Sequence, residues 1–155
     1  MKLRFLTAGI AAAAITGALA IPATAHSDEH EKPFAESKYR MDNMKITVNA
    51  LHNIVQHFKG QAKEDGDVAK LAEIWAVSAS MVKGSFAKDT RGMEGATDAK
   101  ADIWENWADF AKRADDYAAD VKAFADAART GGDIQGTFKQ AASHCKSCHD
   151  KYKED

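Results

Sequence analysis

The sequence predicts an all-α protein, an antiparallel up-down four-helix bundle, and three observations bear on this. Apolar residues recur at three- and four-residue steps in four segments, which is the period of an amphipathic helix. No segment shows the sustained alternation of a strand, and the 155 residues include only two prolines. The pattern Cys145-Lys146-Ser147-Cys148-His149 lies in the last of the four segments. Short turns between the segments favour antiparallel neighbours.

Residues 1–25 have the pattern of a secretory signal peptide that is removed. Two basic residues near the N-terminus precede an uncharged, alanine-rich run that ends before Pro22, and Ala23-Thr24-Ala25 is a small-x-small cleavage site. A membrane anchor is the alternative, but the run is short for a span. We therefore expect export to the periplasm.

Residues 26–155 are then expected to form a single domain. The leader carries two cations and no acids, so its removal changes the formal charge from −2 to −4. This mildly acidic chain has no basic footprint for nucleic acid.

Capping and stop residues divide that domain into four helices. The expected ranges are 34–58, ending before Gly60; 67–86, capped by Asp67; 99–129, ending at Gly131-Gly132; and a last helix capped by Asp133. The first apolar stripe comprises Met41, Met44, Val48, Leu51, Ile54 or Val55, and Phe58. The third comprises Ile103, Trp107, Phe110, Ala114, Tyr117, Val121, Phe124 and Ala128, and the last Ile134, Phe138, Ala141, Cys145, Cys148 and Tyr152. Both cysteines are thus expected on the core face of the last helix.

The C-x-x-C-H pattern is the attachment signal of a c-type haem. Two thiols form thioethers with the porphyrin vinyl groups, and the imidazole of His149 supplies an axial iron ligand. On a helix Cys145, Cys148 and His149 share one side. A thioredoxin-type redox pair would need a βαβ context, and a structural zinc site would need a second ligand pair. Haem attachment is the favoured interpretation, and the exported context agrees with it.

A single haem motif at the C-terminal end of a four-helix bundle resembles the class II c-type cytochromes. These are the cytochromes c′ and their low-spin relatives, the cytochromes c-556 and c-554. The resemblance rests on Cys145–Asp150 with Tyr152, on Lys38-Tyr39-Arg40 and on Asp102-Ile103-Trp104. It implies one covalent haem c and a periplasmic electron carrier or gas sensor, often a homodimer built on the first two helices.

The resemblance also assigns roles to single residues. Arg40 matches the arginine that lies beside the haem and its propionates, and a carboxylate out of water needs such a partner. Met41 stands beside it, where several cytochromes c′ have glutamine. Asp98 falls in the loop that often touches the haem edge. Both are weaker candidates for haem contact than Arg40.

Met44 decides between two functions in this resemblance, because it falls at the distal position facing the iron. If its thioether binds iron, His149/Met44 ligation gives a low-spin electron-transfer protein, which is the favoured reading. The alternative is a high-spin, five-coordinate cytochrome c′ that binds NO or CO at an apolar distal site.

The expected partners are periplasmic redox proteins, with peripheral contact to membrane redox complexes. A peroxidase would need a pair of His and Arg on the distal side, and we see no such pair in the sequence. We therefore expect that the protein is not an enzyme.

Overall fold

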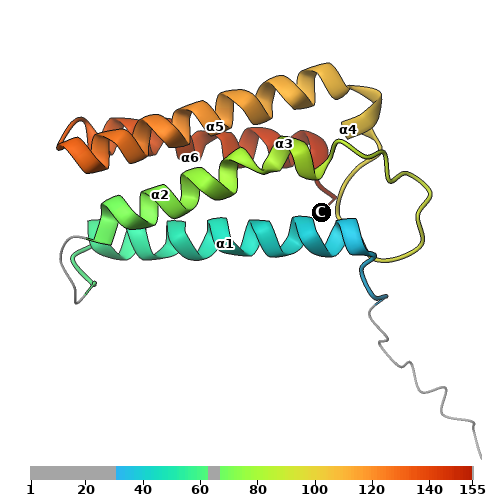
Figure 1. Ribbon diagram of the computed structural model, residues 1–155, viewed down its shortest axis with the longest axis horizontal. Helices are drawn as coiled ribbons and strands as arrows, with labels where there is room; N and C mark the ends of the chain where they lie inside the picture. Colours follow the sequence, from blue (N-terminus) through green and yellow to red (C-terminus); the bar gives the residue numbers. More distant parts are fainter. Residues whose placement is uncertain (1–30, 63–66, 155) are drawn as a thin grey trace, which may run out of the picture.

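The computed structural model describes residues 31–62 and 67–154, and this part of the chain is helical (Figure 1). Its helices are α1 (Ala35–Phe58), α2 (Asp67–Ser80), α3 (Val82–Ser85), α4 (Asp102–Glu105), α5 (Trp107–Thr130) and α6 (Ile134–Tyr152). The four long ones form the predicted bundle, so the fold class is confirmed. The expected signal peptide and its cleavage site lie outside the described residues.

Two of the predicted helices are interrupted. The second breaks at Met81, whose N–H donates to the Ser78 carbonyl, a bond of three-residue span that ends α2 before α3 begins. The third begins later than expected, because Asn106 leaves helical geometry at φ −118° and ψ 40° and separates α4 from α5. The Asn106 side chain donates to the carbonyl of Asp102, 3.2 Å away. Such local side-chain bonds compete with a continuous helix.

Three of the predicted end signals, Gly60, Gly131 and Asp133, are confirmed. Gly60 and Gly131 both adopt positive φ, 66° and 77°, the left-handed geometry that ends a helix after its last carbonyls. Asp133 caps α6, because its Oδ1 accepts from the Gly136 N–H at 2.9 Å.

Aromatic side chains fill the core where α2, α5 and α6 meet. Trp75 is fully buried and its ring lies 5.6 Å from Phe124 and 5.9 Å from Phe138, centroid to centroid. The predicted stripe of the third helix is confirmed in its central part, with these members buried: Ile103, Phe110, Ala114, Tyr117, Val121 and Phe124. Edge-on aromatic contacts of this kind add to the energy of area burial.

The buried face of α1 differs from the predicted stripe. Met41, Val48 and Phe58 were expected inside but are 44%, 59% and 40% exposed. Ile54 is buried as predicted, but the rest of the buried face comprises Ser37, Arg40, Asn43, Thr47 and Ala50. The helix is rotated because its polar residues find partners on α2 and in the loop after α3, and buried polar groups with such partners are tolerated.

Each long helix packs against the next along the chain, α1 on α2, α2 on α5, and α5 on α6. Within the described residues, no Cα of α1 lies within 8 Å of a Cα of α6. These two helices meet through large side chains, as in the Phe58–Phe138 ring contact with centroids 5.0 Å apart. The first and last helices are therefore the widely spaced pair of the bundle.

Candidate haem site

The C-x-x-C-H residues lie within the last turns of α6, as predicted. Cys145 and Cys148 are free and half-buried, and burial raises the pKa of both thiols. His149 lies one position beyond the apolar stripe and is exposed, and its ring has no hydrogen-bond partner among the described residues. Two inward-facing thiols followed by an uncommitted imidazole on one helix fit a covalently attached haem.

The two alternatives to haem attachment find no support in the described part of the chain. The cysteines lie on a helix, and the described residues contain only one isolated β-bridge, Ala99 with Lys153, instead of the strand that a thioredoxin motif requires. Within the same residues, no group of three or more His, Cys, Asp or Glu side chains could hold a metal ion.

Arg40 is buried at the end of the bundle that carries the motif. Its side chain is only 4% exposed, and both terminal nitrogens donate to the Thr90 hydroxyl at 3.3 and 3.2 Å. Burial lowers the pKa of the guanidinium. No carboxylate lies within ion-pair distance of Arg40 among residues 31–62 and 67–154. A buried cation without a counter-ion is costly, so this position fits an anion that comes from outside the chain.

Three aromatic rings surround the Arg40 guanidinium. Its central carbon lies 4.7 Å from the ring centroid of Phe86, 5.6 Å from that of Phe34 and 5.7 Å from that of Trp104. The Trp104 indole N–H donates to the carbonyls of Phe86 and Lys88, so it also fixes the loop that leads to Thr90. Cation–π contacts stabilise the guanidinium without neutralising its charge.

The segment between α3 and α4 connects α1 with the end of α6 (Figure 1). On one side the Ser37 hydroxyl donates to the Ala96 carbonyl at 2.6 Å. On the other side the N–H of Lys100 donates to Tyr152, and the N–H of Glu154 donates to Asp98. Arg40 and the haem motif therefore face the same end of the bundle, which this loop closes.

The remaining predicted site residues occupy different surroundings. Met44 is half-buried and packs against the core. Met41 is exposed, and its sulfur accepts a long hydrogen bond from Ser37. Asp98 is also exposed and pairs with Lys153, with 3.3 Å between Oδ2 and Nζ. The structure thus brings Arg40 and Met44 to the bundle interior but leaves Met41 and Asp98 at its surface.

A buried chain of polar side chains lies next to Met44. The Trp75 indole donates to the Tyr117 hydroxyl at 2.7 Å, and the Thr47 and Ser78 hydroxyls are 2.7 Å apart. Ser78 also donates to Asn43, the neighbour of Met44. Sequence analysis placed Tyr117 on an apolar stripe but missed Asn43, Thr47 and Thr90, because hydrophobic periodicity carries no signal for polar residues.

Asp109 joins α5 to the end of α6. Its Oδ2 accepts from the Tyr152 hydroxyl at 2.6 Å, from Lys151 at 2.9 Å and from Arg113 at 2.7 Å. These donors, Tyr152 first, hold the pKa of Asp109 well below its usual range. The contact fixes the turn of α6 that follows His149.

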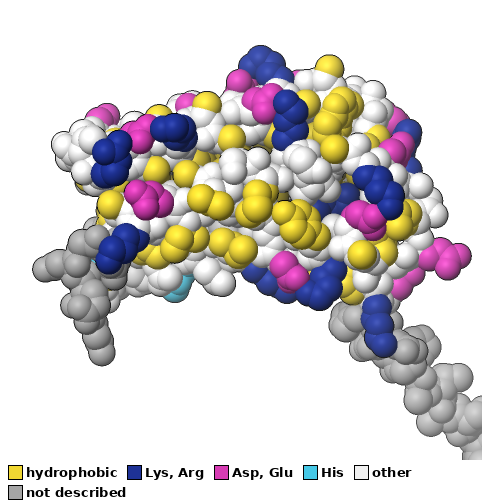
Figure 2. Space-filling model, viewed as in Figure 1, with side chains coloured by type: hydrophobic (Ala, Val, Ile, Leu, Met, Phe, Trp, Pro, Cys, Tyr) yellow, Lys and Arg dark blue, Asp and Glu magenta, His cyan; other side chains and the backbone are white. Residues whose placement is uncertain are grey.

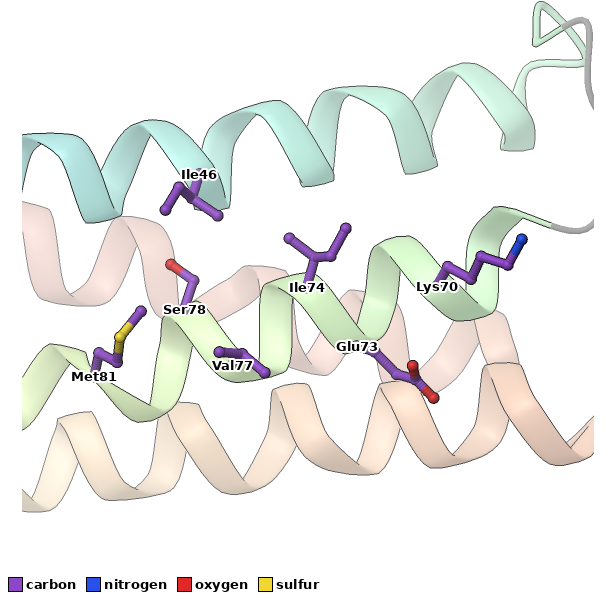
Figure 3. Close-up of a pocket in the computed structure, with 7 residues that line it drawn as sticks. All are labelled: Ile46, Lys70, Glu73, Ile74, Val77, Ser78 and Met81. Atoms are coloured by element: carbon purple, nitrogen blue, oxygen red, sulfur yellow. The ribbon is translucent and has the colours of Figure 1, made fainter.

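The outer faces of α1 and α2 form an apolar groove of about 420 Å³. Figure 2 shows apolar side chains along the line where the two helices meet. In Figure 3, Ile46 from α1 and Ile74 and Ser78 from α2 point toward the space between them. Three of the lining residues are large and well exposed: Ile46 at 45%, Ile74 at 47% and Val77 at 61%.

A helical bundle with a thioether motif in its last helix defines a class II c-type cytochrome. The profile of the family described as Cytochrome C' matches residues 35–153. The chain belongs to this cytochrome c′ family, and membership implies covalently bound haem c.

Known relatives agree with this assignment. Cytochrome c' of Rubrivivax gelatinosus is 30% identical over 131 residues, which cover 81% of this chain and 99% of the relative. Cytochrome c prime from Shewanella frigidimarina aligns with a TM-score of 0.69 and 26% identity, over 77% of this chain and 94% of that one.

A solved variant of cytochrome c prime from Alcaligenes xylosoxidans carries the ferrous state with bound NO. It aligns with a TM-score of 0.68 and 25% identity, over 79% of this chain and 98% of that one. Of the two functions that the sequence left open, the comparisons favour the high-spin cytochrome c′ over the low-spin His149/Met44 carrier.

No helix in the described residues combines the length and apolar character that crossing a bilayer requires.

Proposed function

We propose that this protein is a high-spin cytochrome c′ that binds NO or CO at an apolar distal site and is not an enzyme. The observation that carries the proposal is membership of the cytochrome c′ family, which includes a relative with bound NO. One C-x-x-C-H motif corresponds to one haem c. The leader-like N-terminus and the chemistry of covalent attachment favour the periplasm. There, redox proteins would reduce the iron, among them membrane complexes that this protein would contact peripherally.

The residues of the chain have separate roles in this proposal. Cys145 and Cys148 would hold the haem through thioethers, and His149 would supply the axial nitrogen. The bound haem supplies a redox-active iron with an affinity for diatomic gases. Arg40 offers its positive charge to a haem carboxylate. Met44 would pack as an apolar side chain on the distal side of the haem and would limit the size of what can bind there.

Absorption spectra of the holoprotein test this assignment in the ferric, ferrous, ferrous-CO and ferrous-NO states. We expect high-spin spectra, a large change on addition of either gas, and no weak charge-transfer band of methionine-ligated ferric haem. A low-spin spectrum with that band and no CO response would instead establish the electron carrier with Met44 bound to iron.

Met44→Ala tests the apolar role directly. Without ligation by sulfur, the variant should keep its spin state and bind CO faster, because a distal obstruction is gone. Met93→Ala is the control, since Met93 is a loop methionine that is 38% exposed. A change from low to high spin in Met44→Ala alone would contradict the proposal.

We also propose that the protein is a homodimer that buries the α1–α2 groove. The support is the exposed apolar set Ile46, Ile74 and Val77, because contiguous exposed apolar surface marks association sites. Val77→Asp should raise the Kd of the dimer by at least about tenfold, since a buried unpaired charge is costly. Sedimentation velocity measures this, with Ala119→Asp on the exposed face of α5 as the control. A wild-type protein that sediments as a monomer at all concentrations would refute the dimer.

A further inference from the structure

Thr90 occupies an unusual position for a loop residue. It is only 4% exposed, and its hydroxyl oxygen accepts from both terminal nitrogens of Arg40. We propose that Thr90 is a positioning residue and a second hydrogen-bond donor for the haem carboxylate that Arg40 receives. This inference rests on the proposed function, because it requires the haem to be attached at Cys145 and Cys148.

The Thr90 hydroxyl still has a proton to donate within the described part of the chain. Its oxygen accepts two N–H donors, but none of the described residues accepts its proton. A hydroxyl has one proton to donate as well as two lone pairs. Because Arg40 withdraws electron density from the oxygen, the O–H is a stronger donor toward an anion on the same side.

The local charges favour one incoming carboxylate. Arg40 has no carboxylate within ion-pair distance in the described residues. The nearest acid along α1, Glu36, is already paired with Lys88. Since the aromatic rings of Phe34, Phe86 and Trp104 enclose the guanidinium, its free donors are confined to a narrow direction. A planar carboxylate is the anion that a guanidinium fork binds best.

The position of the loop identifies the source of that carboxylate. The loop reaches α1 through the Ser37 contact and reaches the end of α6 through Lys100 and Tyr152. The loop that carries Thr90 therefore links the helix that carries Arg40 to the end of the helix that carries the haem motif. The haem side chains are the carboxylates that covalent attachment brings permanently to this end of the bundle.

The test compares three variants of the holoprotein: Thr90→Val, which replaces the hydroxyl by a methyl group, Thr90→Ser, which keeps it, and Thr130→Val. Thr130 is the matched control, because its exposed hydroxyl donates to Asp126 at the far end of α5. The measurements are the reduction potential and the resonance Raman bending band of the haem carboxylate side chains.

Thr90→Val should lower the potential and shift the carboxylate band, because a less compensated negative charge stabilises ferric iron. Thr90→Ser and Thr130→Val should match the wild type in both measurements. If Thr90→Val folds poorly, Thr90→Ala removes the same hydroxyl with less steric change. If the band and the potential are unchanged in every variant that lacks the hydroxyl, the proposal is overturned. It is also overturned if an effect appears only when acetate is added, because the carboxylate would then come from solution and not from the haem.

Failure of this inference is distinguishable from failure of the proposed function. The Thr90 variants report on the carboxylate, whereas gas binding and spin state report on the iron. A low-spin wild type without CO response would refute the proposed function. An unchanged carboxylate band beside a normal CO response would refute the role of Thr90 alone.

Discussion

The contact of α1 with α2 and the contact of α5 with α2 and α6 are built from different chemistry. Where α1 meets α2, the buried groups include Asn43, Thr47 and Ser78, which bond to one another. Where α5 meets its neighbours, Trp75 and Phe124 dominate and are fully buried. The polar contact is directional and fixes the rotation of α1, whereas the aromatic contact buries large rings.

This difference explains how one bundle can be both stable and precise beside its site. Apolar packing stabilises a fold in proportion to the buried area but tolerates small rotations. Hydrogen bonds between buried hydroxyl and amide groups lose much of their strength when a helix rotates. The polar contact therefore lies on the helix that carries Arg40 and Met44, where orientation affects function.

The largest expected effect comes from the aromatic contact. Trp75→Ala should lower the free energy of unfolding by about 3–5 kcal/mol, because it opens a cavity among buried rings. Urea denaturation followed by far-UV circular dichroism measures the loss. Trp107→Ala, at the half-buried start of α5, should cost clearly less. Equal losses would mean that the aromatic core does not dominate stability.

A smaller effect should come from the polar contact. Ser78→Ala removes the buried hydroxyl that bonds to Thr47 and to the Asn43 oxygens, and it should cost about 1–3 kcal/mol. Ser80→Ala, two residues further along α2, should change stability little, because Ser80 is exposed and bonds only to the Val77 carbonyl. Identical midpoints in urea for the two variants would show that the network contributes nothing.

The smallest expected effect depends on pH and concerns the link between α5 and α6. The pKa of Asp109 is held below its usual value, first by Tyr152 and then by Lys151 and Arg113. Such a carboxylate stabilises the fold fully above its unfolded pKa of about 3.9 and loses this contribution as pH falls further. Asp109→Asn should thus lower the melting temperature at neutral pH, with a difference that shrinks below about pH 4.

Melting curves of wild type and Asp109→Asn across this pH range give the measurement. Asp116→Asn is the control, because its exposed carboxylate contacts only Lys112. A difference between wild type and Asp109→Asn that grew in acid would contradict this role for Asp109.

Much of the fold could be predicted from the sequence, because it depends on periodicity and on helix ends. The stripe of α5 is apolar along its length, so its buried face follows directly from the 3.6-residue period. The stop at Gly131 and the cap at Asp133 follow from backbone geometry and side-chain chemistry that are local to those residues.

The buried face of α1 could not be predicted in the same way. Several of its apolar residues, including Ile46 and Val48, remain exposed. Its true inner face holds Asn43 and Thr47, whose partners lie on another helix. Periodicity identifies an apolar face but does not show whether that face meets the core or another molecule.

The candidate site was predictable to the extent that its chemistry is local. Cys145, Cys148 and His149 form a contiguous motif, and the resemblance added Arg40 and Met44. Three rings enclose Arg40, those of Phe34, Phe86 and Trp104, and they lie up to 64 positions from it in the sequence. The contact of Arg40 with Thr90 comes from a loop without a periodic pattern. These tertiary contacts require the structure.

The spacing of the first and last helices has a consequence for how the chain folds. Because each long helix packs on the next one in sequence, three helix pairs can form without bringing the two ends of the chain together. The contact between α1 and α6 closes the longest loop of chain and therefore has the highest entropic cost. In the described residues, the Cα atoms of these two helices do not approach within 8 Å of each other. We therefore expect the closure between α1 and α6 to be the slowest and most separable step of folding.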